Sequence, residues 1–103
     1  MYKSDNNKNY ILKKSKRKGK RFEIDMGDMS HHFASDVGKT YIDGRTDKEK
    51  QNWEARHKSD KNWNNKHSGI YYSRYLLWGK FPDLKKNIKL LEKKDKVKIE
   101  LDI

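Results

Sequence analysis

Apolar and polar residues alternate in two segments of the chain, and this alternation predicts strands. Phe22, Ile24 and Met26 are separated by acidic residues, which is typical of a strand with one buried face. Residues 97–103 repeat the pattern with four apolar and three charged side chains. Residues 10–12 are a short apolar segment and residues 31–37 are less clearly patterned, and we expect both to form further strands.

A helical pattern begins in the middle of the chain. The run from Thr46 to Glu49 fits a capping box, in which a threonine hydroxyl and a glutamate satisfy free backbone N–H groups. We expect this helix to extend to about Lys58. Its one large apolar residue is Trp53, so most of its surface must face water.

Two more helices are expected in the C-terminal half. Ser68 can cap a helix that continues to Trp78 through the most apolar stretch of the chain, and we expect this helix to form the centre of the core. Gly79 and Pro82 end it. Apolar residues at helical spacing in 84–91 predict the third helix.

These elements together predict an α+β fold. We expect a small antiparallel sheet, built mainly by an N-terminal hairpin and short strands, with residues 97–103 as a candidate C-terminal strand. This sheet would pack on two or three helices. Residues 1–9 are rich in Asn and Lys and are predicted to form a flexible tail. Residues 10–103 would then form a single domain.

Composition narrows the classes of protein that fit. The 103 residues carry a formal net charge of +11, with 40% charged and 32% hydrophobic residues. Without cysteine, disulfides, thiolate zinc sites and a cysteine nucleophile are excluded. The sequence has no apolar run long enough to span a membrane and no apolar segment typical of a secretory signal. We therefore expect an intracellular protein that is not secreted and does not contact a membrane.

The positive charge is concentrated at the N-terminus. Residues 1–21 have a net charge of +8, residues 22–79 are neutral, and residues 80–103 have +3. Phosphate neutralisation by such a cluster drives sequence-independent binding to nucleic acid. Tyr10 and Phe22 flank the cluster and could stack on exposed bases. The predicted nucleic-acid contacts are Lys13, Lys14, Lys16, Arg17, Lys18, Lys20 and Arg21.

A second candidate site is polar. Arg56 and His57 follow Trp53 by one helical turn, and an arginine can bind phosphate or carboxylate with two hydrogen bonds. The alternative, which we favour, is structural: Arg56 pairs with a carboxylate such as Asp43 or Asp36, and His57 bonds to a backbone carbonyl. The four histidines lack the spacing of a metal site. We therefore expect no metal, no cofactor and no catalytic residue.

A series of short motifs runs through the middle of the chain: His32 and Phe33, Tyr41 and Asp43, Asp47 and Lys48, Arg56 and His57, and Ser73 with Leu76, Leu77, Trp78 and Gly79. These motifs resemble a family of small basic proteins of unknown function from large (giant) DNA viruses. The resemblance covers roughly residues 20–91 and departs from the family at Ala34, where the family has glycine, and at the last strand. It implies a viral source and no enzymatic activity.

Charge and resemblance together lead to one functional expectation and one alternative. The first is a non-catalytic accessory protein that binds nucleic acid or another polyanion with little sequence preference. The alternative is a small structural protein of the virion, whose basic segment docks on an acidic surface of a capsid or other virion protein. In both cases the protein would be found in an infected host cell or in the virion.

Overall fold

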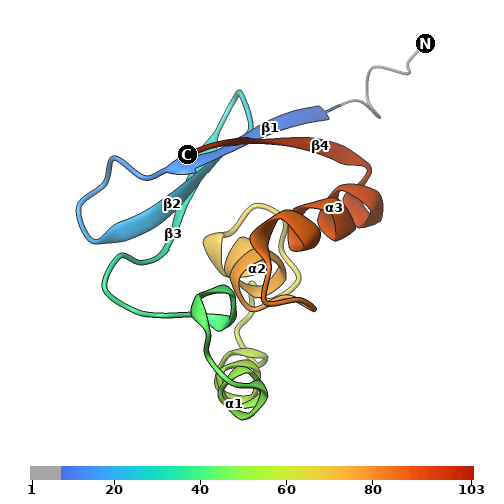
Figure 1. Ribbon diagram of the computed structural model, residues 1–103. Coiled ribbons are helices and arrows are strands. Elements are labelled where there is room, and N and C mark those ends of the chain that lie inside the picture. Colours follow the sequence, from blue (N-terminus) through green and yellow to red (C-terminus); the bar gives the residue numbers. More distant parts are fainter. Residues whose placement is uncertain (1–7) are drawn as a thin grey trace.

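A four-stranded sheet forms one side of the molecule (Figure 1). The computed structural model describes residues 8–103. The strands are β1 (Lys8–Lys14), β2 (Lys20–Asp25), β3 (Ser30–Ser35) and β4 (Val97–Asp102), in the spatial order β3-β2-β1-β4. The predicted α+β class and the four strand segments are confirmed.

The sheet is mixed, which differs from the antiparallel sheet expected from the sequence. β1 pairs antiparallel with β2, with Leu12 opposite Ile24. β4 instead pairs parallel with β1, with Ile99 opposite Tyr10. A parallel neighbour requires a long crossover connection, and the helical region between β3 and β4 provides it. Strand alternation alone cannot distinguish the two directions, because both have the same period.

The first strand begins earlier than expected. Lys8 and Asn9, which the sequence assigned to a flexible tail, lie in β1 opposite Val97 and Lys98 of β4. The pairing with β4 therefore extends β1 beyond its apolar residues. The remainder of the predicted tail, residues 1–7, lies outside the described residues.

Three helical regions lie below the sheet. The helix α1 (Asp47–His57) begins at the predicted capping box: Glu49 N donates to Thr46 Oγ1 at 3.1 Å, and Thr46 N donates to Glu49 Oε1 at 2.9 Å. The helix α2 (Gly69–Tyr72) continues into a π-helical turn, η3 (Ser73–Leu77), and α3 (Leu84–Asp95) follows. The three helices expected from the sequence are confirmed, although the second has the wider π-helical winding at its end.

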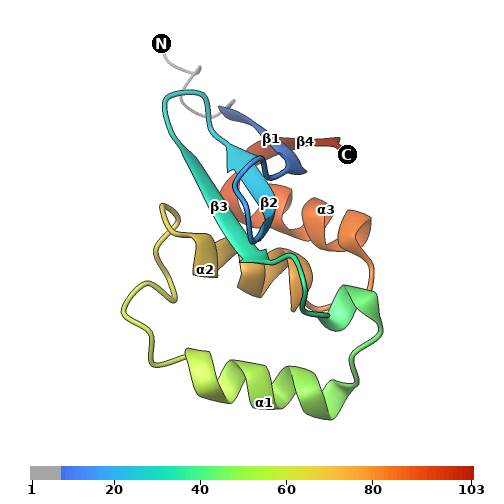
Figure 2. The same ribbon diagram turned by 90° about the vertical axis from the view of Figure 1, so that its left-hand side faces the viewer.

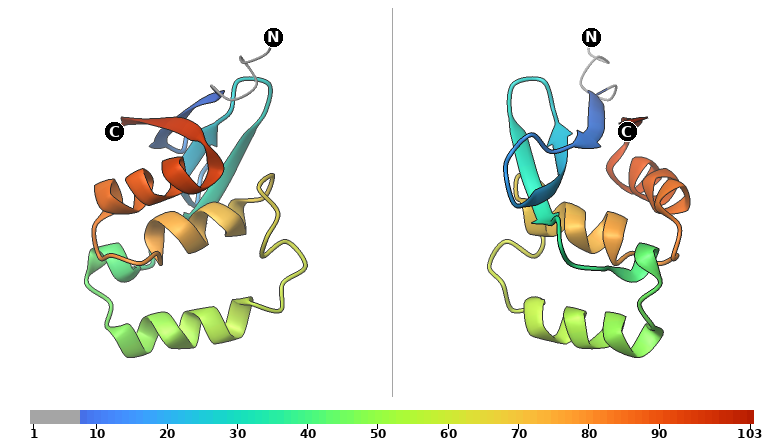
Figure 3. Two further views of the ribbon diagram at one scale, coloured as in Figure 1. Left: turned by 90° about the vertical axis from the view of Figure 1, so that its right-hand side faces the viewer. Right: turned by 60° about the vertical axis from the view of Figure 1, so that its left-hand side comes forward.

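The helices form two further layers. Figures 2 and 3 show α2 and α3 next to the sheet, and α1 on the far side of α2. The buried side chains of the sheet and of α2–η3 meet in the middle. The fully buried residues with the largest side chains are Tyr71, Tyr72, Leu12, Ile24, Leu76, Leu77, Leu91 and Asn87. The aromatic helix is thus the centre of the core, as the sequence predicted.

The connection after η3 is fixed by a buried amide. The Asn87 amide donates to the carbonyls of Leu76 and Phe81 at 2.9 and 2.8 Å and accepts from Phe81 N at 3.0 Å. A Cβ atom at Gly79 would lie 2.2 Å from the Tyr75 carbonyl oxygen, so glycine is required there. These contacts hold Trp78, just before the glycine, at the end of the aromatic helix.

Within residues 8–103, no helix has the length and apolar character needed to cross a membrane.

Candidate functional site: a cationic turn beside a tryptophan-walled cleft

The turn between β1 and β2 has a defined backbone. Ser15 N donates to Arg21 O and Lys20 N donates to Arg17 O, both at 3.1 Å. The Ser15 hydroxyl accepts from Arg17 N at 2.9 Å and lies 2.7 Å from His32 Nδ1. Gly19 has a φ of 84°, a conformation that glycine adopts without steric cost. The basic residues of this segment are therefore displayed on an ordered hairpin.

The seven predicted nucleic-acid contacts divide into two groups. Lys13 forms an ion pair with Asp25 at 3.3 Å, and Arg21 forms a two-pronged pair with Asp43 at 2.5 and 2.8 Å. The other five are exposed, and none has an acidic partner among residues 8–103. We call these five the cationic turn: Lys14, Lys16, Arg17, Lys18 and Lys20.

The aromatic residues beside this turn do not form a stacking surface. Phe22 is 5% exposed and packs against Phe33 in the core, with ring centroids 5.8 Å apart. Tyr10 is half-buried on the same face of the sheet. The expectation that both flanking aromatics could stack on bases is wrong for Phe22, because its place in the strand alternation turns it inward.

Asp43 connects the cationic hairpin to the loop before α1. It lies in the short helix η2 (Tyr41–Asp43) and accepts hydrogen bonds from Thr40 N and Thr40 Oγ1, both at 2.9 Å. The hydrogen bond from the Arg21 guanidinium, together with those from Thr40, lowers the pKa of Asp43 to about 2. Asp43 is therefore charged at neutral pH and holds the two segments together.

The predicted pairing of Arg56 with Asp43 or Asp36 is wrong. Asp43 is occupied by Arg21, and no hydrogen bond or ion pair of Arg56 occurs within the described part of the chain. His57 packs against Trp53, with ring centroids 4.7 Å apart, in place of the expected bond to a carbonyl. Asp43 and Arg56 therefore do not belong to one polar site. Asp43 pairs with Arg21, and we call this ion pair the clamp.

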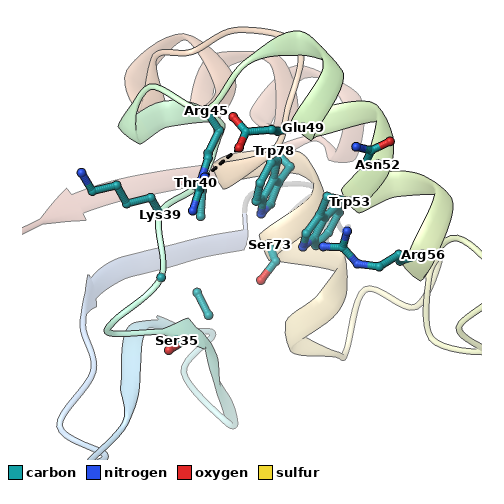
Figure 4. Close-up of a pocket in the computed structure, with 12 residues that line it drawn as sticks. Ser35, Lys39, Thr40, Arg45, Glu49, Asn52, Trp53, Arg56, Ser73 and Trp78 are labelled. Carbon is teal, nitrogen blue, oxygen red and sulfur yellow. Dashed lines mark hydrogen bonds and ion pairs between the residues drawn. The ribbon is translucent and has the colours of Figure 1, made fainter.

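Arg56 belongs to a cleft of about 500 Å³ between the end of β3, the β3–η2 loop, α1 and η3. One wall contains Trp53 and Trp78, whose rings stack with centroids 5.1 Å apart and planes 9° apart. Figure 4 shows the Arg56 guanidinium next to Trp53, whereas the Lys39 side chain is directed away from the two tryptophans. Tertiary packing thus brings together residues from four separate segments.

The cleft wall has an excess of positive charge. Lys39, Arg45 and Arg56 are cationic, and Glu49 is the single carboxylate among the twelve described lining residues. Arg45 Nη1 lies 2.7 Å from Glu49 Oε2, so these two charges largely compensate each other. Lys39 and Arg56 remain, and the cleft is therefore suited to an anion.

The cationic turn and the cleft are neighbours. Asp36 N, just after β3, donates to Gly19 O at 3.3 Å, and Ser35 pairs with Lys20 across the sheet. Ala34 and Ser35 line the cleft. A polyanion that follows the cationic turn therefore passes close to the cleft.

Sequence reasoning identified Arg56 and missed Lys39, Arg45 and Ser73 as members of one site. Lys39 lies in a glycine-flanked loop, and Ser73 lies in a helix that the sequence predicts to be core. The short sequence distance between Trp53 and Arg56 was the available signal, because one helical turn places both on one face. Within residues 8–103, no three His, Asp or Glu side chains are grouped to hold a metal ion.

Comparison with known proteins adds no family to this description. No protein-family model matches the chain. No curated protein and no solved structure matches it either. The arrangement of the cationic turn and the cleft is accordingly the observation on which a functional assignment of this chain depends.

Proposed function

We propose that this chain is a non-catalytic nucleic-acid-binding accessory protein of a large DNA virus, with little sequence preference. The observation that carries the proposal is the cationic turn, in which five exposed basic residues on one ordered hairpin have no acidic partner among the described residues. The sequence resemblance to small basic viral proteins supports the viral source.

Phosphate contacts by these side chains account for affinity without base readout. Each phosphate that a lysine or arginine neutralises releases condensed counter-ions, and this release favours binding. Such contacts carry no sequence information. Because Phe22 is buried, the turn offers charge without a neighbouring aromatic surface from β2, which favours phosphate contacts over base stacking.

A salt titration tests the proposal. We expect the logarithm of affinity for duplex DNA to fall linearly with the logarithm of salt concentration, with a slope of about −0.9 per neutralised phosphate. Replacing all five residues of the cationic turn by Gln should flatten the slope by several units, up to about 4.5 if each contacts one phosphate. Two unrelated duplexes should bind nearly equally.

A matched control separates local contacts from net charge. Five exposed lysines on α3 and β4 can be replaced by Gln, which changes the net charge equally: Lys85, Lys86, Lys89, Lys93 and Lys98. This variant should keep most of the wild-type slope. Equal flattening in both variants would contradict a localised site. If the wild-type protein does not bind DNA at low salt, the virion-structural alternative is favoured, and binding to an acidic virion protein becomes the next measurement.

A further inference from the structure

The cleft beside the cationic turn presents hydrogen-bond donors without partners. Trp53, Trp78 and Ser73 line it and are at least nine-tenths buried, with 9%, 8% and 8% exposure. In the part of the chain that the structure describes, the two indole N–H groups and the Ser73 hydroxyl have no protein hydrogen-bond partner, and none of these atoms is sealed from solvent. Figure 4 shows the nitrogen-bearing edges of both rings turned toward Ser73.

Cations surround these donors, and free acceptors are few. Lys39 and Arg56 are exposed and have no partner among residues 8–103. The carboxylate of Glu49 already accepts from Thr46 N at 2.9 Å and from Arg45 at 2.7 Å. A ligand in the cleft therefore meets one uncompensated guanidinium, that of Arg56, together with neutral N–H and O–H donors, and Lys39 adds a second exposed cation at the rim.

This arrangement favours a ligand rich in hydrogen-bond acceptors. A phosphomonoester carries a charge of about −1.5 to −2 at neutral pH and three acceptor oxygens, which suits a guanidinium, a second cation at the rim and several neutral donors. A carboxylate has one charge and two oxygens. Arg56 adds a planar guanidinium that can bind two phosphate oxygens at once.

The size of the cleft allows more than a phosphate group. Its volume of about 500 Å³ lies within the roughly 300–1,000 Å³ typical of small-molecule sites. Trp53 and Trp78 already stack on each other, and Trp53 also packs against His57. A base therefore cannot enter between the two indoles, so the anionic group is held at the edges of the rings.

We infer that the cleft binds the phosphomonoester of a nucleotide, either a free mononucleotide or the phosphorylated end of a nucleic-acid strand. The second source rests on the proposed function, because the strand would reach the cleft from the cationic turn: the Gly19 carbonyl in that hairpin accepts a hydrogen bond from Asp36 N, directly after the cleft residue Ser35. The first source does not depend on it.

Calorimetric titration with small ligands tests the chemistry of the cleft. The full chain should bind a 5′-deoxymononucleotide and should bind the corresponding nucleoside at least about 10-fold more weakly, since the charge-assisted hydrogen bonds are then lost. Arg56→Gln should weaken mononucleotide binding by about 10-fold or more. Ser73→Ala should weaken it by about 3- to 10-fold.

Lys61→Gln is the matched control for Arg56→Gln. Lys61 is an exposed cation that follows α1 and does not line the cleft, so its replacement should leave binding unchanged. Equal affinity for nucleoside and mononucleotide, or an equal loss in both variants, would overturn the inference. Tighter binding of a phosphoserine peptide than of the mononucleotide would also overturn it, in favour of a phosphoprotein partner.

Strand ends separate this inference from the proposed function. A single-stranded oligonucleotide with a 5′-phosphate should bind more tightly than the same strand with a 5′-hydroxyl, and Arg56→Gln should abolish that preference while the salt slope persists. The five-Gln variant of the cationic turn should have the flattened salt slope and retain mononucleotide binding. If the wild-type protein binds mononucleotides but not DNA, the proposed function fails. If it binds DNA but not mononucleotides, the inference about the cleft fails. Mononucleotide binding without an end preference would limit the cleft to free nucleotides.

Discussion

The cationic turn and the cleft place similar charges in different surroundings. The turn consists of exposed side chains on a hairpin, and none of its five cations is held by an acidic partner among the described residues. The cleft shares its wall with the core, because Trp53, Trp78 and Ser73 are at least nine-tenths buried. The positive charge of the turn therefore depends on one exposed hairpin, whereas the cleft forms only when the sheet and the helices pack together.

This difference predicts different binding behaviour. Exposed flexible cations interact with any polyanion and are strongly screened by salt. Donors fixed in a partly enclosed site discriminate by geometry, because a group that does not fit leaves them unsatisfied. One molecule thus combines a general and a selective anion site, and mutations can separate the two.

The largest expected effect comes from removing a shared wall of the cleft and the core. Trp78→Ala deletes a ring that is 8% exposed and stacked on Trp53. We expect a loss of about 3–5 kcal/mol in the free energy of unfolding, enough to unfold a marginal small domain. Thermal denaturation followed by circular dichroism measures this.

The five-Gln variant of the cationic turn provides the comparison in stability for Trp78→Ala. Exposed surface substitutions usually change stability by less than about 0.5 kcal/mol, so its melting temperature should stay close to that of the wild type. If Trp78→Ala shifts the melting temperature by only a degree or two, the cleft is not part of the core and the comparison fails.

A smaller effect is expected at the clamp between the two regions. Arg21→Gln removes the partner that most strongly lowers the pKa of Asp43, and we expect a loss of about 1 kcal/mol at neutral pH. The Asp43 pKa is about 2 in the folded protein against a reference value of 3.8. Its stabilisation is therefore complete above pH 4 and disappears as the pH falls toward 2.

Denaturant unfolding at several pH values checks the clamp. The difference in stability between the wild type and Arg21→Gln should narrow as the pH falls from about 4 to about 2, because protonated Asp43 no longer pairs with Arg21. A difference that stays constant down to pH 2 would show that Arg21 stabilises the fold through packing on Phe22, whose ring centroid is 4.9 Å away.

The smallest expected effect lies at the boundary of the cleft. Ala34, which lines it, has a φ of 68°, and this left-handed conformation costs a non-glycine residue about 1–2 kcal/mol. Ala34→Gly should relieve that cost, but glycine loses more backbone entropy on folding. We expect a net stabilisation of about 0.5 kcal/mol, measured as a rise in the denaturation midpoint. Any destabilisation would show that the Ala34 methyl group contributes packing that outweighs the strain.

Local sequence patterns predicted much of the fold. The capping box at Thr46 and the alternation in residues 22–26 and 97–103 depend on contacts within a few residues, and the structure contains each element. The parallel direction of β4 was missed, since the pairing of β4 with β1 joins residues that are about 90 positions apart in sequence.

The site was less predictable than the fold. Clustering in sequence was enough to identify seven basic residues, but structure alone shows that Asp25 and Asp43 pair with two of them. The proposed partner of Arg56 was wrong because Asp43 had a nearer cation, and no sequence signal ranks competing partners across separate segments.

The sequence by itself determined the charge of the N-terminal segment, the aromatic core helix and the approximate positions of most elements, since these follow from composition and short-range periodicity. Only the tertiary structure decided which cations remain free and that Lys39, Trp53, Arg56, Ser73 and Trp78 line one cleft. The physical reason is that a cleft is a product of packing between layers. Its members come from distant segments, and their positions depend on how the sheet and the three helices fit together.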